Sequence, residues 1–156
     1  MGQPTSEQVN LMLRFFELRR EARLRQAREW FIENFRPTSI EDMMKNYPFG
    51  SEANTNMRMV TSYWEMAANL VNRGLMDEEL FFETTGEQWI VWERVKPIVA
   101  AWRAAFKNPQ VFANLEEHCK RMDAWREKRA PGSTEAMRQM LQQMAMRQAQ
   151  AKTAAD

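Results

Sequence analysis

The sequence predicts an all-α protein, a helical bundle of about five to six helices. Apolar residues recur at steps of three and four along most of the chain, which is the period of a helix with one buried face. The alternation of apolar and polar residues that is typical of strands never extends beyond four residues. Capping residues, prolines and glycines stand where the apolar stripes begin and end, so the helix boundaries can be predicted as well.

The first predicted helix extends from Thr5 to Phe35. Thr5 and Gln8 have the spacing of a capping box, in which each residue satisfies a backbone amide of the other. Arg36-Pro37 ends the helix, because a residue before proline avoids the helical region. The buried stripe comprises Val9, Leu13, Phe16, Leu24, Ala27, Phe31 and Phe35.

Two helices are predicted in the next third of the chain. A short one occupies "SIEDMMKNY", with Ser39 as its cap. The second has the clearest pattern of all and ends at Gly74, a residue suited to the left-handed conformation that follows many helices. Its inward residues are Met57, Val60, Trp64, Ala67 and Val71.

The following segment contains a short helix and a longer, kinked one. Asp77 caps "EELFFE", and Thr85 with Gln88 repeats the capping-box spacing. The apolar period continues past Pro97 to Trp102 and Phe106, so we expect the proline to kink this helix without ending it.

The last third of the chain contains two predicted helices. Asn108-Pro109 predicts the start of one that reaches about Arg129. "APGS" is the predicted domain boundary, between a helical bundle domain at 1–130 and a methionine-rich amphipathic helix at 131–156, which Ser133 caps. On that last helix Met137, Met140 or Leu141, and Met144 share one face.

The chain lacks the residues that most kinds of catalysis require. One histidine, His118, and one cysteine, Cys119, are too few for the usual zinc sites, and they diverge when adjacent on a helix. The glycine motifs of nucleotide-binding loops and the nucleophile motif of hydrolases are absent. We therefore expect no metal, no cofactor and no enzyme activity.

The partners predicted from composition are proteins. The net charge is +1, with an acidic middle between basic ends, which solvated helix faces of mixed sign explain best. The basic stretch "RREARLRQAR" is interrupted by glutamates, so nucleic acid is not a favoured partner. No apolar run has the length of a spanning helix, and peripheral membrane contact is not favoured. A single cysteine fits a cytoplasmic location.

Residues from Met57 to about 116 resemble a family of small bacterial helical proteins catalogued as a domain of unknown function, number 4760. The resemblance rests on "LVNRGLMDEELF" with Gly74, Asp77 and Leu80, and on "FANLE" at 112–116. Between these lie Trp89 or Trp92, Pro97 and Arg103. The resemblance implies an all-helical, bacterial domain with no catalytic residues to transfer, and it leaves the first helix and the methionine-rich helix outside.

Two functional hypotheses follow. The first is a non-enzymatic interaction protein, an accessory or adaptor subunit of a bacterial assembly or a homo-oligomer, which engages through its terminal helices. Methionine adapts to irregular grooves, so Met137, Met140, Leu141 and Met144 are the candidate partner-binding residues, with docking on the chain's own domain as the alternative. The second is a ligand-binding or regulatory module with an apolar pocket lined by Trp64, Trp92, Trp102 and Phe106.

Overall fold

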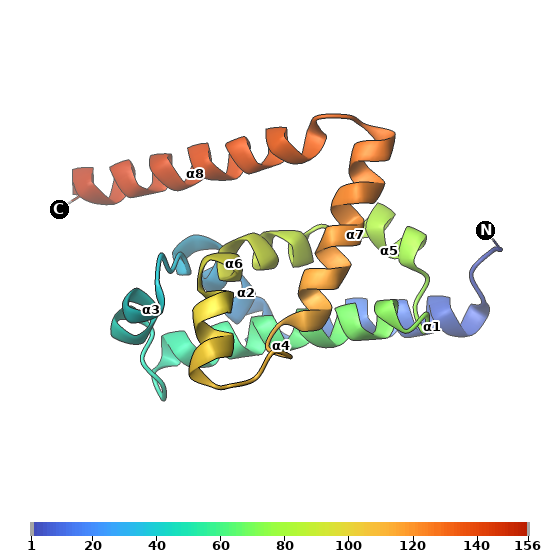
Figure 1. The fold of residues 1–156 in the computed structure, drawn as a ribbon, viewed down its shortest axis with the longest axis horizontal. Helices are drawn as coiled ribbons and strands as arrows, with labels where there is room; N and C mark the ends of the chain where they lie inside the picture. Colours follow the sequence, from blue (N-terminus) through green and yellow to red (C-terminus); the bar gives the residue numbers. More distant parts are fainter. Residues whose placement is uncertain (1, 156) are drawn as a thin grey trace. The chain divides into compact units, whose positions relative to one another are not determined.

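Eight helices make up the part of the chain that the computed structural model describes, residues 2–155 (Figure 1). No strand occurs among these residues, so the all-α class is confirmed, while the expected count of five to six helices is too low. The helices are α1 (Ser6–Arg19), α2 (Ala22–Asn34), α3 (Ile40–Asn46), α4 (Glu52–Asn72), α5 (Glu78–Thr84), α6 (Glu87–Ala105), α7 (Ala113–Arg129) and α8 (Ser133–Ala155).

The chain divides into two compact units, Met1–Cys119 and Lys120–Asp156. This division lies inside α7. The boundary predicted from the sequence, after Ala130, stays a prediction. Each unit is described below by itself.

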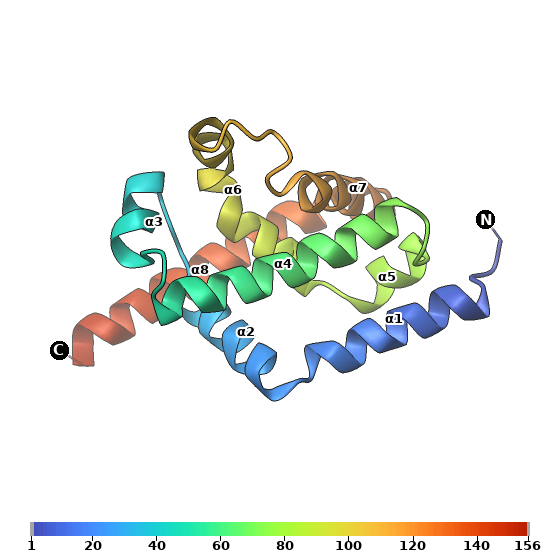
Figure 2. The same ribbon diagram turned by 90° about the horizontal axis from the view of Figure 1, so that it is seen from below.

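The long helix predicted from Thr5 to Phe35 is wrong, because the chain turns between α1 and α2 (Figure 2). Arg20 ends α1, and the carboxylate of Glu21 accepts hydrogen bonds from the amides of Arg23 (2.9 Å) and Leu24 (2.8 Å). Glu21 thus caps α2 and supplies the acceptors that a new helix start requires. The apolar stripe continues across this turn, so its period alone does not reveal the break.

The predicted capping box of α1 is confirmed, and one of its members also reaches α4. Thr5 Oγ1 accepts from the amide of Gln8 (3.2 Å), and Gln8 Oε1 accepts from the amide of Thr5 (2.9 Å). Gln8 Nε2 in turn donates to the carbonyl of Gly74 (3.0 Å), just past the end of α4. Gly74 has φ of 73°, the left-handed conformation predicted for a glycine at this place.

Helix α4 carries the core of the first unit. The five inward residues that its sequence pattern predicts are all buried: Met57, Val60, Trp64, Ala67 and Val71. Its most extensive packing is with α2, whose buried residues are Leu24, Ala27 and Phe31. Burial of such apolar side chains is the main stabilising contribution to a helical core.

Helices α5 and α6 follow the sequence prediction in part. Asp77 caps α5, as predicted, by accepting from the amide of Leu80 (2.8 Å). The expected capping box of Thr85 and Gln88 is wrong, because α6 begins after Gly86 and Gln88 Nε2 instead donates to Thr85 Oγ1 (2.9 Å). Helix α6 continues through Pro97, and its axis changes direction part-way along (Figure 1), which confirms the predicted kink.

In the second unit the start of α8 is capped from α7. The carboxylate of Glu127 accepts from the amides of Gly132 (2.8 Å) and Thr134 (3.0 Å), and these bonds lower the pKa of Glu127. Asp123 pairs with Arg138 of α8 at 3.1 Å. The predicted cap, Ser133, has a hydroxyl that makes no hydrogen bond within the described residues. A distant carboxylate therefore replaces the local cap.

A hydrogen-bonded ion pair joins three helices of the first unit. The guanidinium of Arg28 on α2 donates to both carboxylate oxygens of Glu87 on α6, and Trp64 Nε1 on α4 donates to the same carboxylate (3.2 Å). Both charged side chains are more than four-fifths buried. The hydrogen bond with Glu87 raises the pKa of Arg28, so the guanidinium stays charged at neutral pH.

Tyr63 forms a second polar contact between helices. Its hydroxyl donates to the carbonyl of Phe15 on α1, and its ring packs against that of Phe15 with centroids 5.5 Å apart. Burial raises the pKa of Tyr63 to about 12, since the phenolate would be poorly solvated there; Arg19 and Arg28 oppose this shift.

Replacing Glu87 tests the contribution of the ion pair. Glu87→Gln leaves the buried Arg28 charge without its counter-ion and is expected to lower the free energy of unfolding by about 2–3 kcal/mol. Urea unfolding followed by circular dichroism measures this loss. The exposed Glu17→Gln substitution on α1 is the control and should change stability by less than about 0.5 kcal/mol. Equal effects of the two substitutions would contradict the proposed contribution.

The shifted pKa of Tyr63 makes stability depend on pH in the alkaline range. The folded-state pKa lies above the ordinary value of 10, so the contribution is fully present below pH 10 and is lost as pH rises towards about 12. The free energy of unfolding of the wild type should therefore fall more steeply between pH 10 and about 12 than that of Tyr63→Phe. Parallel profiles for the two proteins would show that Tyr63 does not titrate in this way.

Candidate functional site

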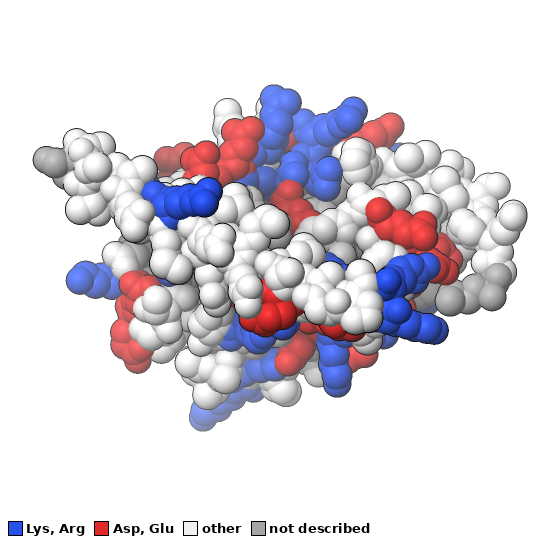
Figure 3. All heavy atoms as spheres, turned by 90° about the horizontal axis from the view of Figure 1, so that it is seen from above, with Lys and Arg blue, Asp and Glu red and all other residues white. Residues whose placement is uncertain are grey.

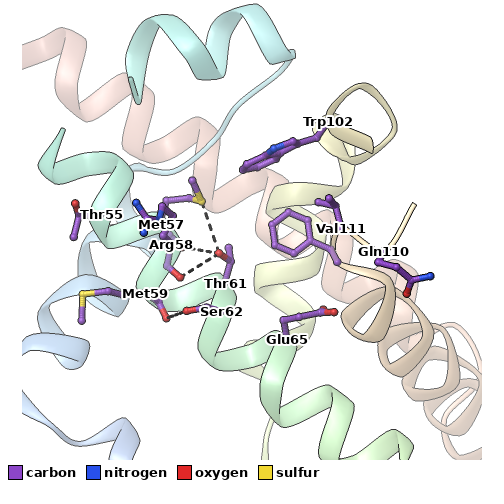
Figure 4. Close-up of a pocket in the computed structure, with 11 residues that line it drawn as sticks. Thr55, Met57, Arg58, Met59, Thr61, Ser62, Glu65, Trp102, Gln110 and Val111 are labelled. Atoms are coloured by element: carbon purple, nitrogen blue, oxygen red, sulfur yellow. Dashed lines mark hydrogen bonds between the residues drawn. The ribbon is translucent and has the colours of Figure 1, made fainter. Parts of the chain in front are cut away.

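An open groove of about 600 Å³ lies beside α4 in the first unit (Figure 4). One wall consists of α4 residues, and the other is formed by Trp102 of α6 and by residues 110–112, which precede α7. The apolar lining residues are Met57, Met59, Trp102, Val111 and Phe112. The volume is in the range of small-molecule sites, and the mixture of aromatic, sulfur-containing and polar side chains is typical of them.

Phe112 stands in the wall of this groove with a strained backbone. Its φ is 55°, a left-handed conformation that a bulky residue rarely adopts. The Phe112 ring meets the ring of Trp102 edge-on, with centroids 5.5 Å apart and planes at 83°. Such a conformation persists only where surrounding contacts enforce it.

Arg103 supplies one of those contacts. Its Nε donates to the carbonyl of Val111 (2.9 Å), and its Nη2 donates to Glu116 Oε2 on α7 (2.6 Å). One guanidinium thereby fixes the residue before Phe112 and the first turn of α7. Because the guanidinium is planar, its two bonds fix the orientation of these two acceptors as well as their distance.

Glu65 of α4 supplies the second contact by capping α7 from another helix. Its Oε1 accepts from the backbone amide (3.1 Å) and the side-chain amide (2.9 Å) of Asn114, and its Oε2 accepts from the amide of Leu115 (2.8 Å). Asn72 Nδ2 adds a bond to the carbonyl of Asn114 (3.0 Å). A carboxylate at a helix N-terminus satisfies unpaired amides and opposes the positive end of the helix dipole.

These contacts explain why the predicted start of the seventh helix is wrong. Asn108 does act as a local cap, since its Oδ1 accepts from the amide of Gln110 (2.9 Å), but it closes only a turn. The helix begins at Ala113, next to the amides that Glu65 binds. A cap provided from another helix leaves no signature in the local sequence.

The charge that the groove presents comes from Arg58. Its guanidinium lies over the ring of Phe49 at 5.4 Å, and no carboxylate among residues 2–155 pairs with it. Glu65 is the acidic lining residue, and its oxygens are already bound by the amides of α7. The groove therefore offers an unpaired cation and no unpaired carboxylate.

The four aromatic residues of the predicted pocket lie in different environments. Trp64 is buried and bonded to Glu87, and Trp92 is buried in the core. Trp102 lines the groove, whereas the neighbouring Phe106 is 66% exposed and is not among its lining residues. Arg58, Glu65 and Phe112 also line the groove and were not among the predicted site residues. The local sequence carries no sign of the left-handed conformation of Phe112.

The predicted partner-binding residues lie along α8 in the second unit. Met140 is 60% exposed and Met144 is 47% exposed, while Met137 and Leu141 are half-buried. Met146 is exposed as well. Large apolar side chains on a charged helix therefore remain open to solvent at several positions.

The first terminal helix also presents apolar side chains. Leu13 and Leu18 of α1 are exposed, and Leu18 borders a second groove of about 400 Å³ between α1 and α4. The lining of this groove is mostly apolar and includes Phe15, Leu18, Leu24, Met59, Tyr63 and Met66.

Charged side chains of both signs are distributed over the surface. Acidic and basic side chains lie next to one another on the face drawn in Figure 3. Within residues 2–155 no three His, Cys, Asp or Glu side chains come together as a metal site requires. No helix in this part of the chain combines the length and apolarity needed to cross a membrane. The expected lack of enzyme activity stays a prediction.

The chain belongs to the family described as a domain of unknown function, DUF4760, whose profile matches residues 4–122. The match is longer than the resemblance at 57–116 predicts, because it includes α1 and α2, which were expected to lie outside. Helix α8 does lie outside it. No curated protein and no solved structure matches the chain.

Replacing Glu65 tests whether it holds the wall of the groove. Glu65→Ala removes the cap of α7 and is expected to lower the free energy of unfolding by about 1–2 kcal/mol. Amide hydrogen exchange at Asn114 and Leu115 should also become faster, because both amides lose their acceptor. Met66→Ala, at the next and exposed position of α4, is the control. Unchanged exchange at these two amides would contradict the capping role.

Proposed function

We propose that this member of the DUF4760 family is a non-enzymatic protein-interaction module. In this proposal it serves in the cytoplasm as an accessory or adaptor subunit of a bacterial assembly, or as a homo-oligomer. It engages its protein partner through the terminal helices α1 and α8, and it requires no cofactor.

The observation that carries this proposal is the exposure of Met140 and Met144 on α8. A helix of 23 residues that leaves large apolar side chains in water gains free energy when a partner covers them. Methionine is unbranched and flexible, so a methionine-rich helix can follow an irregular surface that branched side chains would not fit.

Two further features support the same function. Helix α8 lies outside the family match, so it is an addition to the shared domain that can give this chain its own partner. On α1, Leu13 and Leu18 are exposed, and Leu18 borders an apolar groove, the kind of surface that receives a partner's apolar side chains.

The test compares three tagged forms of the full chain in affinity capture from host cells. The first is the wild type, the second Met140→Glu with Met144→Glu, and the third the matched control, Gln142→Glu with Gln150→Glu. Glutamate favours the helix in both double variants, but only the first pair removes apolar surface. The wild type and the control should retain the same partner in stoichiometric amount, and the methionine variant should lose it.

A second, differently tagged copy of the chain in the same cells reveals whether the partner is the chain itself. If all three forms retain the same proteins, α8 does not contribute to binding. If the wild type retains nothing and sediments as a monomer, the interaction function fails altogether.

A further inference from the structure

The groove beside α4 combines aromatic and sulfur-containing side chains around a space of small-molecule size. Trp102 and Val111 face the α4 residues Met57 and Thr61 across it (Figure 4). Thr61 Oγ1 is already bonded to the carbonyl of Met57 (2.9 Å), so this buried hydroxyl does not demand a ligand. A flat ring is the shape that edge-on aromatic rings and thioether sulfurs bind most favourably.

The charged side chains of the groove indicate which polar group such a ligand would carry. Glu65 directs its carboxylate to the amides of Asn114 and Leu115, so its charge lies against the positive end of α7 and forms no ion pair with Arg58. Arg58 lies at the rim, held over the ring of Phe49, without a carboxylate partner in the described chain. A guanidinium in this position matches the geometry of a carboxylate.

Hydrogen bonds hold the wall of the groove on both sides of Phe112. Phe112 holds a left-handed backbone because Arg103 fixes Val111 while Glu65 and Asn72 fix Asn114. Strained conformations enforced from both sides are found preferentially at ligand sites, where they reduce the cost of ordering on binding.

From this arrangement we propose that the groove is a binding site for a small aromatic carboxylate. The ring lies between Met57 on α4 and the Trp102–Phe112 pair, and the carboxylate is bound by Arg58. No lining residue belongs to α1, and the groove shares Met59 and Ser62 with the second groove, between α1 and α4.

The test uses two matched probes, naphthalene-2-carboxylate and its neutral counterpart naphthalene-2-methanol, with the full-length protein in isothermal titration calorimetry. The wild type should bind the carboxylate more tightly than the alcohol. Arg58→Gln should weaken binding of the carboxylate about tenfold and leave binding of the alcohol unchanged. Arg58 is exposed, so this variant keeps the fold.

A second variant tests the aromatic wall. Phe112→Gly removes the ring but suits the left-handed backbone, so the chain should fold as the wild type does while binding of both probes is lost. Met44→Ala, an exposed position on α3, is the control and should bind as the wild type does. Absence of saturable binding by the wild type, or equal binding by Phe112→Gly, overturns the site. An equal affinity for the two probes overturns the role of Arg58.

Discussion

Glu87 places one carboxylate where three helices of the first unit meet. Apolar contacts between α2, α4 and α6 are non-directional, so they define the register of the helices less sharply than hydrogen bonds do. The bonds from Arg28 and Trp64 are directional, and they set one register. Arg28 also donates to the carbonyl of Arg19 (3.2 Å), near the end of α1, so the same group locates the turn between α1 and α2.

Three acidic residues of the first unit accept hydrogen bonds from backbone amides at helix starts. Glu21 caps α2, Asp77 caps α5 and Glu65 caps α7 from a distance. The acidic middle of the sequence is therefore no guide to the charge that the groove presents. Glu65 is directed to the start of α7, and Arg58 is the basic residue that lines the groove.

Much of the fold could be predicted from the sequence because it depends on neighbours along the chain. The inward face of α4, the turn at Gly74, the cap at Asp77 and the kink at Pro97 each have a local signature. The turn at Glu21 does not, since glutamate is an unusual cap. The groove was not predictable, because Glu65 and Asn114 meet only after folding, and tryptophan content does not reveal which ring stays at the surface.

Gln8 belongs to two helix ends at once, through its bonds to Thr5 and to the carbonyl of Gly74. When the first turn of α1 frays, the carbonyl of Gly74 loses its hydrogen-bond donor, Gln8. When the end of α4 frays, Gln8 loses its acceptor. This bond therefore links the start of α1 to the end of α4, two places 66 residues apart in the sequence. Helix α4 has 21 residues and a length of about 30 Å, so the bond from Gln8 acts at the end of α4 farthest from α3.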